Sequence, residues 1–348
     1  MITLGADSHK RTHTFVAADS NGREVGSRTV RATPAGHLDA LRWAEQWPER
    51  TWALEDCRHL SRRLESELLR AGERVVGVPP KLMAGARRSA RERGKSDPID
   101  AAAVARAALR EPDLPVAVLD GPERELRLLV DHREDLVAER TRMQNRLLWH
   151  LHDLEPGLEV PAGALSTLKV LDAVQARLAD VCGTVAAIAR ELLDRIAELT
   201  RRVNQLERDI AGRVAPLAPT LLALHGCGAL SAAKVVGETA GVRRFRSRAA
   251  FARHNGTAPI PVWSGSERFR LNRGGNRQLN AALHRIAITQ MQRPGPARDY
   301  IERRRAAGDT KTEAIRALRR RISDEVYRRM LVDAHFHTDA RPARARAA

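Results

Sequence analysis

Hydrophobic and polar positions follow two different periods along the chain. Over the first 115 residues, short apolar runs bounded by turn residues alternate with stretches of helical spacing. The expected strands are 2–7, 14–18, 22–30, 52–54 and 74–78. The expected helices are 34–47, 59–70, 81–91 and 98–109. Three strands followed by alternating helices and strands predict a mixed sheet covered by helices.

The middle of the chain predicts long helices over 122–214, with a break near 156–161. In the second helix the apolar residues recur every three or four positions, which is typical of a coiled-coil seam. The seam residues are Val185, Ile188, Leu192, Ile196, Leu199, Val203, Leu206 and Ile210. A helical hairpin within one chain and a dimerisation arm would both bury this seam, so the pattern leaves both open.

The remaining chain predicts a mostly helical segment with glycine-rich loops over 218–333. We therefore expect an acidic α/β domain at 1–115, a helical linker and dimerisation region at 116–217, an all-α domain at 218–334 and a basic, disordered tail at 335–348.

Charge points to the class of partner. The chain has 348 residues with 60 Lys and Arg against 43 Asp and Glu, so its net charge is +17. Such a balance favours a polyanion, most often nucleic acid. Aromatic residues make up only 3%, which argues against base stacking on single strands as the main binding mode.

Two further features bear on location. The three cysteines lie far apart and form no Cys-x-x-Cys pair, which fits a reducing compartment and excludes a zinc ribbon. No run of 18 uncharged apolar residues and no signal peptide are present, so no membrane partner is expected. We expect a cytoplasmic protein associated with the nucleoid.

Four acids form the first candidate site. Asp7 ends the first strand and Glu55 ends the strand 52–54, so neighbouring strands would bring both carboxylates to one sheet edge. Asp97 and Asp100 are three residues apart, on one side of a helix that begins near Pro98. Carboxylates gathered in this way bind Mg²⁺ (or Mn²⁺) beside a phosphodiester. Taken singly, Asp97 also suits a helix N-cap and Asp100 a solvated first-turn acid.

A glycine-rich turn forms the second candidate site. Gly226 and Gly228 stand between two helical stretches, as in a helix-hairpin-helix, and Lys234 lies one turn into the second helix. Small residues let backbone N–H groups approach a phosphate, and a helix N-terminus favours negative charge. The alternative is a simple glycine-rich helix connection.

A serine loop forms the third. Ser264 and Ser266 flank Gly265 and are followed by basic and amide side chains. These are Arg268, Arg270, Arg273, Asn276 and Arg277. Arginines around a serine can neutralise a phosphate and favour attack by the hydroxyl. Outside this context, serines beside glycine are usually turn residues.

Taken together, these segments resemble the DEDD transposases of bacterial insertion sequences. The resemblance rests on Gly5-Ala6-Asp7-Ser8-His9-Lys10-Arg11-Thr12-His13, on Leu54-Glu55-Asp56, on Lys95-Ser96-Asp97-Pro98-Ile99-Asp100, and on Ser264-Gly265 followed by Gly275-Asn276-Arg277. It implies a RuvC-like, RNase H-type domain carrying the four acids. Lys10 and His13 match basic positions of the first motif, whereas Glu55-Asp56-Cys57 departs from the usual acid, small residue, glycine run.

The resemblance also implies a mechanism and partners. In that family a serine, matched by Ser264 with Ser266 as competitor, links covalently to DNA in a composite site with the acidic domain of another subunit. It implies donor and target double-stranded DNA, a guide RNA from the element's non-coding end, and a homodimer that pairs into a tetramer. Two alternatives remain: a metal-dependent nuclease or junction resolvase that uses water, and a non-catalytic nucleic-acid-binding protein.

Overall fold

The computed structural model describes residues 1–55, 60–79, 82–83, 96–111, 114–119, 121–264, 266–270, 272 and 274–339. Its contacts divide the chain into two units. Pro122–Glu238 forms one, here called the central unit, and Met1–Gly121 with Thr239–Ala348 forms the other. Each is described by itself.

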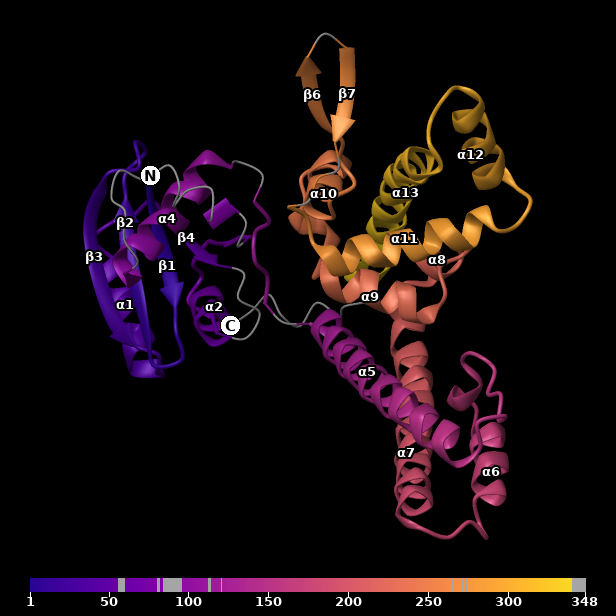
Figure 1. The fold of residues 1–348 in the computed structure, drawn as a ribbon. Coiled ribbons are helices and arrows are strands. Elements are labelled where there is room, and N and C mark those ends of the chain that lie inside the picture. Colours follow the sequence, from indigo (N-terminus) through magenta and orange to yellow (C-terminus); the bar gives the residue numbers. More distant parts are fainter. Residues whose placement is uncertain are drawn as a thin grey trace. The chain divides into compact units, whose positions relative to one another are not determined.

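A five-stranded mixed sheet organises the first 119 residues (Figure 1). Its strands are β1 (Ile2–Ser8), β2 (Thr12–Ala18), β3 (Glu24–Arg31), β4 (Arg50–Glu55) and β5 (Val75–Val78). The strand order is β3-β2-β1-β4-β5. The first three strands pair antiparallel, and β1–β4 and β4–β5 pair parallel. The predicted mixed sheet is confirmed, and its order is that of an RNase H-type fold.

Helices cover both faces of this sheet. On one face, α1 (Pro34–Ala44) and α2 (Arg62–Arg70) pack on a core that includes Phe15 and Trp52. Thr33 caps α1 as predicted, since its hydroxyl accepts a hydrogen bond from the Gly36 backbone N–H at 3.2 Å. On the other face lies α4 (Asp97–Arg110). Most of the expected helix 81–91 falls outside the described residues.

The contact between α4 and β1 is unusually close because Gly5 on the strand has no side chain and the facing helix residues are alanines. A Cβ added at Gly5 would lie 2.1 Å from the Ala101 carbonyl oxygen and 2.5 Å from the Ala105 backbone nitrogen. Real atoms cannot approach so closely, so only glycine fits on the strand. Alanines on the facing helix complete the contact. This contact fixes the height of α4 above the end of β1.

The central unit is built on two long helices, α5 (Pro122–Leu154) and α7 (Thr184–Leu217), connected by η1 (Ala164–Ser166) and α6 (Leu168–Arg177). Ion pairs link them in antiparallel order: Glu125–Arg213, Arg133–Glu207 and Glu139–Arg195. Most of the predicted seam is buried, with Ile196, Val203 and Ile210 at most 1% exposed. The seam is therefore covered within the chain, which selects the helical hairpin from the two arrangements the pattern allowed.

Two short helices follow the hairpin: α8 (Pro219–Leu222) and α9 (Ala229–Thr239). Gly226 joins them with a positive φ of 80°, a left-handed conformation that glycine adopts without strain. A Cβ at Gly237 would meet the Arg127 backbone of α5 at 3.0 Å. The glycine-rich turn therefore belongs to the same compact unit as α5 and α7.

The C-terminal segment is mostly helical, as expected. It contains η2 (Val242–Arg244), α10 (Arg248–His254), β6 (Ile260–Ser264), β7 (Ser266–Arg270), α11 (Arg277–Met291), α12 (Pro296–Ala306) and α13 (Lys311–Asp339). The helix α13 packs against α10, α11 and α12. It runs through Asp339, so the first five residues of the expected disordered tail are helical, while 340–348 lie outside the described residues.

Candidate active site

The parallel register of the sheet aligns the first two acids. Ala6 on β1 pairs with Leu54 on β4, so Asp7 and Glu55 follow side by side where the two strands end. Alternate residues of a strand point to opposite faces. Leu4 and Ala6 face the core under α1, which places Asp7 on the face covered by α4. Glu55 shares that face by the same alternation.

The N-terminus of α4 supplies the other two acids. The Ser96 hydroxyl is the N-cap of this helix and accepts a hydrogen bond from the Ile99 backbone N–H at 3.5 Å. Asp97 is therefore the first helical residue rather than the cap, so the alternative structural role considered for it is wrong. Asp100 is buried at 6% exposure, so the reading as a solvated first-turn acid is also wrong.

A histidine joins this acidic centre. The His9 Nε2 atom lies 3.1 Å from Asp7 Oδ2 and 3.4 Å from Asp97 Oδ1. One ligand atom from each of Asp7, His9 and Asp97 falls within 4.8 Å of the others, the spacing of a metal site. The sequence pattern did not single out His9, because its position two residues after Asp7 gains meaning only when Asp97 is brought beside it.

The electrostatics of Asp7 favour a cation. Burial raises the pKa of the Asp7 carboxyl, His9 opposes that rise, and the nearby Asp100 and Asp97 carboxylates raise the pKa further. A buried carboxylate beside like charges is stabilised by a divalent ion, which prefers oxygen ligands. The residues present therefore fit the Mg²⁺ or Mn²⁺ that the acids imply, with Asp7 and Asp97 as first candidates to hold it.

The two basic positions of the first motif differ in exposure. Lys10 is exposed in the turn between β1 and β2. His13 is 2% exposed and stacks on His37, with ring centroids 5.1 Å apart. Burial, with the nearby His37 and His9, lowers the His13 pKa to about 4. His13 therefore supports the sheet as a neutral ring and does not present a charge to nucleic acid.

The serine loop is a β-hairpin, which the glycine-rich pattern did not reveal. The strand β6 ends at Ser264 and β7 begins at Ser266, and these two residues pair across the turn. Arg268 and Arg270 follow on β7. Gly265 and Arg273 lie outside the described residues. The backbone thus brings Ser264 and Ser266 to the same level and does not separate the two candidates.

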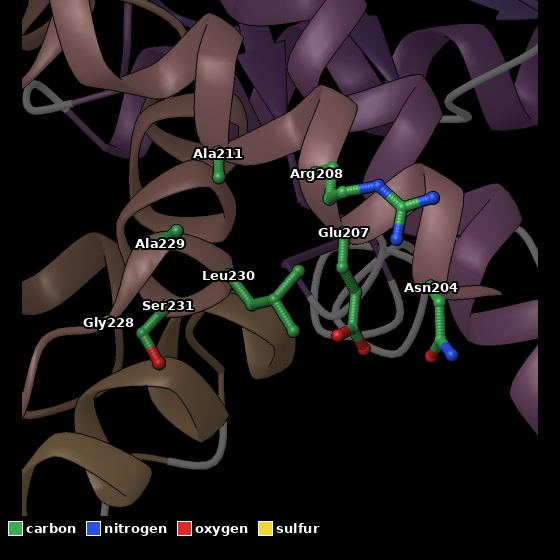
Figure 2. Close-up of a pocket in the computed structure, with 8 residues that line it drawn as sticks. All are labelled: Asn204, Glu207, Arg208, Ala211, Gly228, Ala229, Leu230 and Ser231. Carbon is green, nitrogen blue, oxygen red and sulfur yellow. The ribbon is translucent and has the colours of Figure 1, made fainter.

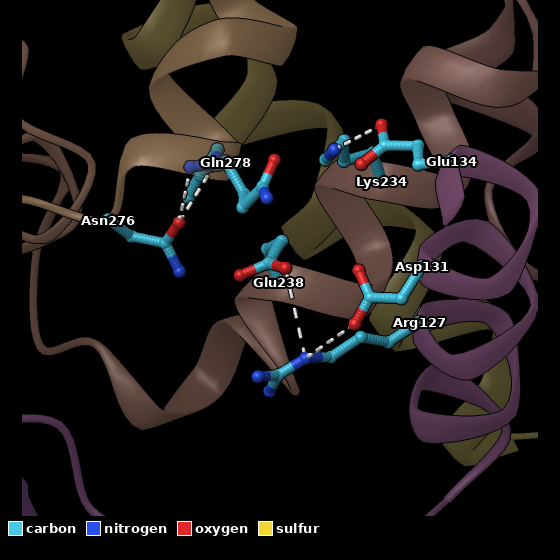
Figure 3. A network of polar contacts seen from close by, with 8 residues as sticks. Arg127, Asp131, Glu134, Lys234, Glu238, Asn276 and Gln278 are labelled. Carbon is cyan, nitrogen blue, oxygen red and sulfur yellow. Dashed lines mark hydrogen bonds and ion pairs between the residues drawn. The ribbon is translucent and has the colours of Figure 1, made fainter. Parts of the chain in front are cut away.

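The segment after the hairpin has a structural use. A Cβ at Gly275 would lie 2.2 Å from the Gly256 backbone nitrogen, so this position requires glycine. The Asn276 side chain caps α11, since its Oδ1 accepts hydrogen bonds from the Gln278 and Leu279 backbone N–H groups at 3.0 Å each (Figure 3). Arg277 is exposed at the start of α11. Arg277 is therefore better placed than Asn276 to contact nucleic acid.

The residues of the predicted helix-hairpin-helix differ in their exposure and contacts. Gly228 lines an open pocket of about 540 Å³ between α7 and the start of α9, together with Asn204, Arg208 and Ser231 (Figure 2). Lys234 is instead 3% exposed and forms an ion pair with Glu134 of α5 (Figure 3). Its ammonium group therefore ties α9 to the hairpin rather than facing a phosphate.

Fold and site together define a class. An RNase H-type sheet that gathers carboxylates at the ends of its central strands is the framework of a metal-dependent enzyme acting on phosphodiesters. Sequence comparisons then name the family. Residues 4–156 match the family model of the IS110-type DEDD transposases, and residues 218–302 match the model described as "Transposase IS116/IS110/IS902 family". The chain belongs to the DEDD transposases of insertion sequences.

Relatives agree along the whole chain. The protein is 29% identical to a 44.8 kDa protein of insertion element IS116 from Streptomyces clavuligerus, over 98% of this chain and 97% of that protein. It is 26% identical to a 42 kDa protein of insertion element IS900 from Mycobacterium paratuberculosis, over 97% of each chain. The solved structure of Thermus thermophilus RuvC with a Holliday junction aligns with 34% of this chain and 99% of its own, at 14% identity and a TM-score of 0.27.

Among the residues that the structure describes, no helix has the length and apolar character needed to cross a membrane.

Proposed function

We propose that this transposase cuts and rejoins DNA at a composite site made of the acidic centre and the serine hairpin. The observation that carries the proposal is the convergence of Asp7 and Asp97, with Asp100 close by and Glu55 on the neighbouring strand. Asp7, Glu55, Asp97 and Asp100 would hold the metal. When bound, Mg²⁺ supplies positive charge to a phosphate that is gaining negative charge.

The reaction then uses the serine. The Ser264 hydroxyl attacks the scissile phosphorus, a P–Oγ bond forms, and the bond to the leaving DNA oxygen breaks. The proton lost by the serine is balanced by the proton that the leaving hydroxyl gains. Attack by the hydroxyl of another strand reverses the link, so strands are exchanged with no external energy source. Arg268, Arg270 and Arg277 would neutralise the phosphate beside the hairpin.

The partners follow from the same family. Donor and target double-stranded DNA would be paired by a guide RNA from the element's non-coding end, read by the protein through backbone and shape. A homodimer that pairs into a tetramer would let the acids of one subunit meet the serine of another. We place this activity in the cytoplasm, at the nucleoid.

Covalent trapping tests the chemistry. Full-length protein, Mg²⁺, the flanking non-coding RNA and a labelled DNA carrying the element junction would be resolved on a denaturing gel. We expect a protein–DNA adduct that is absent from Ser264→Ala and from Asp7→Ala and present in Ser266→Ala. An adduct lost only in Ser266→Ala would move the nucleophile to that residue.

The second candidate is a nuclease or junction resolvase that uses the acids and water. The acidic centre alone favours it, since that centre does not need the serine. Cleavage that survives Ser264→Ala and Ser266→Ala, forms no adduct and is lost in Asp7→Ala would establish this reading. If Asp7→Ala changes nothing, the protein is a non-catalytic nucleic-acid-binding protein.

A further inference from the structure

A second basic site lies between the last two helices. A pocket of about 500 Å³ is lined by Tyr300, Arg303 and Arg304 of α12 and by Arg321 of α13. Figure 1 labels both helices, in the orange and yellow that mark the last part of the sequence. The family model that matches this part of the chain ends at residue 302. No motif in the sequence pointed to this pocket, which we call the α12–α13 arginine pocket.

Helical spacing creates one wall of the pocket. Tyr300, Arg303 and Arg304 stand three and four residues apart, so they share one face of α12. The Arg304 Nε donates a hydrogen bond to Asp309 Oδ2 at 2.5 Å, which fixes that side chain. Because Asp309 occupies the Nε edge, the other guanidinium nitrogens of Arg304 keep donor capacity for a ligand.

The opposite wall holds a second prearranged guanidinium. The Arg321 Cζ atom lies 4.2 Å from the centre of the Tyr300 ring. Such stacking uses the flat face of the guanidinium and leaves its N–H groups directed outward in its plane. Within the described part of the chain, neither Arg321 nor Arg303 has an acidic partner. Two of the three guanidiniums are therefore not neutralised by the protein.

The surroundings do not cancel this charge. Residues 296–321 contain nine Lys and Arg against four Asp and Glu. Two of the four acids already form ion pairs: Glu302 with Arg298, and Asp309 with Arg304. The segment therefore keeps an excess of positive charge around the pocket.

We propose that the α12–α13 arginine pocket binds a phosphodiester group of a nucleic-acid backbone. Arginine forks match the paired oxygens of a phosphate, and three of them converge here. The one aromatic ring in the lining has Arg321 over one face, and the other lining residues are arginines, so the pocket favours a charged group over a free nucleotide base. The ligand is therefore recognised by its charge and shape, with no reading of sequence. The proposal rests on the proposed function only in taking nucleic acid as the partner.

Salt-dependent binding tests it. Full-length protein would be titrated by fluorescence anisotropy against two separate probes: the junction duplex DNA and the structured non-coding RNA. The Arg303→Gln/Arg321→Gln variant would be compared with Arg298→Gln/Arg328→Gln. The control pair removes the same charge from the same two helices, but its arginines are already neutralised by Glu302 and Glu325. Circular dichroism would check that both variants fold.

We expect the pocket variant to bind one of the two probes about 10-fold more weakly and to reduce the slope of log K against log salt by about 1, the value of one phosphate contact. The control variant should stay close to wild type. The probe that responds identifies DNA or RNA as the source of the phosphate. Equal losses in both variants, or no loss for either probe, would overturn the proposal.

A catalytic substitution separates this result from the proposed function. Asp7→Asn abolishes the chemistry proposed above but leaves the arginine pocket intact. If Asp7→Asn protein shows the same loss on Arg303→Gln/Arg321→Gln, the pocket stands whether or not the serine reaction is found. If wild-type protein forms the adduct but the pocket variant binds normally, the pocket proposal is wrong and the proposed function still stands.

Discussion

At the scale of single residues, burial and the neighbouring carboxylates raise the pKa of Asp7 and make it costly to ionise. The Asp7 carboxyl is buried and has Asp100 and Asp97 beside it, and among the described residues His9 is the group that lowers its pKa. A carboxyl whose pKa is raised in the folded state binds its proton more tightly there, so its ionisation near neutral pH costs folding free energy. Sites that keep such a cost are commonly those that need it for function.

The first prediction concerns this cost. Asp7→Asn should raise the free energy of unfolding in EDTA by about 1 kcal/mol, a typical size for one substitution, because it removes the buried charge. It should also abolish the increase in melting temperature that Mg²⁺ or Mn²⁺ gives wild-type protein. Thermal melts with and without metal measure both effects. Asp39→Asn, at an exposed position paired with Arg28, is the control; an equal metal response in Asp7→Asn would contradict the site.

His13 gives a second prediction, on pH. Its folded-state pKa of about 4 lies below the ordinary value of 6.5. Above pH 6.5 the ring is neutral in both states and its full contribution to stability is present. As the pH falls from 6.5 towards 4, the unfolded state takes up the proton first. Stability should therefore fall by up to about 3 kcal/mol across that window.

Urea unfolding at several pH values measures this loss. His13→Leu should show a shallower fall in the free energy of unfolding between pH 6.5 and 4, because the buried imidazole that must stay neutral is gone. The exposed His132→Gln variant should follow wild type. Equal slopes for wild type and His13→Leu would show that groups other than His13 account for the whole acid response.

At the scale of elements, α4 is the part that assembles the acids. It carries Asp97 and Asp100 at its N-terminus and packs its alanines directly on β1 at Gly5. The distance between helix and strand is therefore set by backbone contact rather than by side chains that could repack. Any atom added at the contact must move the helix, and the two acids move with it.

Gly5→Ala tests this arrangement. We expect a loss of about 1–3 kcal/mol in the free energy of unfolding, the usual cost of overpacking, together with a weaker metal-induced rise in melting temperature. Gly77→Ala is a matched control, since it also lies in a strand of the sheet but a Cβ there meets nothing within 4 Å. If both variants melt and respond to metal alike, the close contact does not position the acids.

Sequence patterns predicted these elements unevenly. The strands β1, β2 and β4 and the helices α1 and α4 follow from apolar runs and turn residues, and Thr33 follows from capping chemistry. The hairpin β6–β7 was not foreseen, because glycines and serines beside arginines do not distinguish a loop from a tight strand pair. A local sequence pattern also does not reveal which distant residue a side chain will pair with. The pairing of Lys234 with Glu134 and of His9 with Asp97 depends on residues about 90–100 positions apart.

At the scale of the whole molecule, the proposed reaction requires two separate parts of the chain. The acids lie on the N-terminal sheet and α4, and the serines lie on the β6–β7 hairpin. Most of the seam of α7 is covered by its own hairpin, while the seam residue Ile188 stays 38% exposed. Trp149 on α5 is a second large apolar side chain that is exposed, at 77%.

Mixing inactive subunits tests whether the site is shared. Asp7→Asn and Ser264→Ala proteins each fail to form the covalent adduct. Co-expressed in equal amounts, they should recover about a quarter of the wild-type adduct if acids and serine come from different subunits, since half the dimers are mixed and each has one intact site. Two co-expressed copies of Ser264→Ala are the control. No recovery would assign both parts to one subunit.

The placement of Asp7, Glu55, Asp97 and Asp100 has a consequence for synthesis. These residues and the sheet and helices that hold them lie within the first 119 positions. A ribosome adding about 5–20 residues per second needs roughly 7–30 s more to reach Ser264. The acids proposed to hold the metal thus emerge before the proposed nucleophile, Ser264, has been synthesised. Under the proposed mechanism, a growing chain would carry all four acids before it is able to attack DNA.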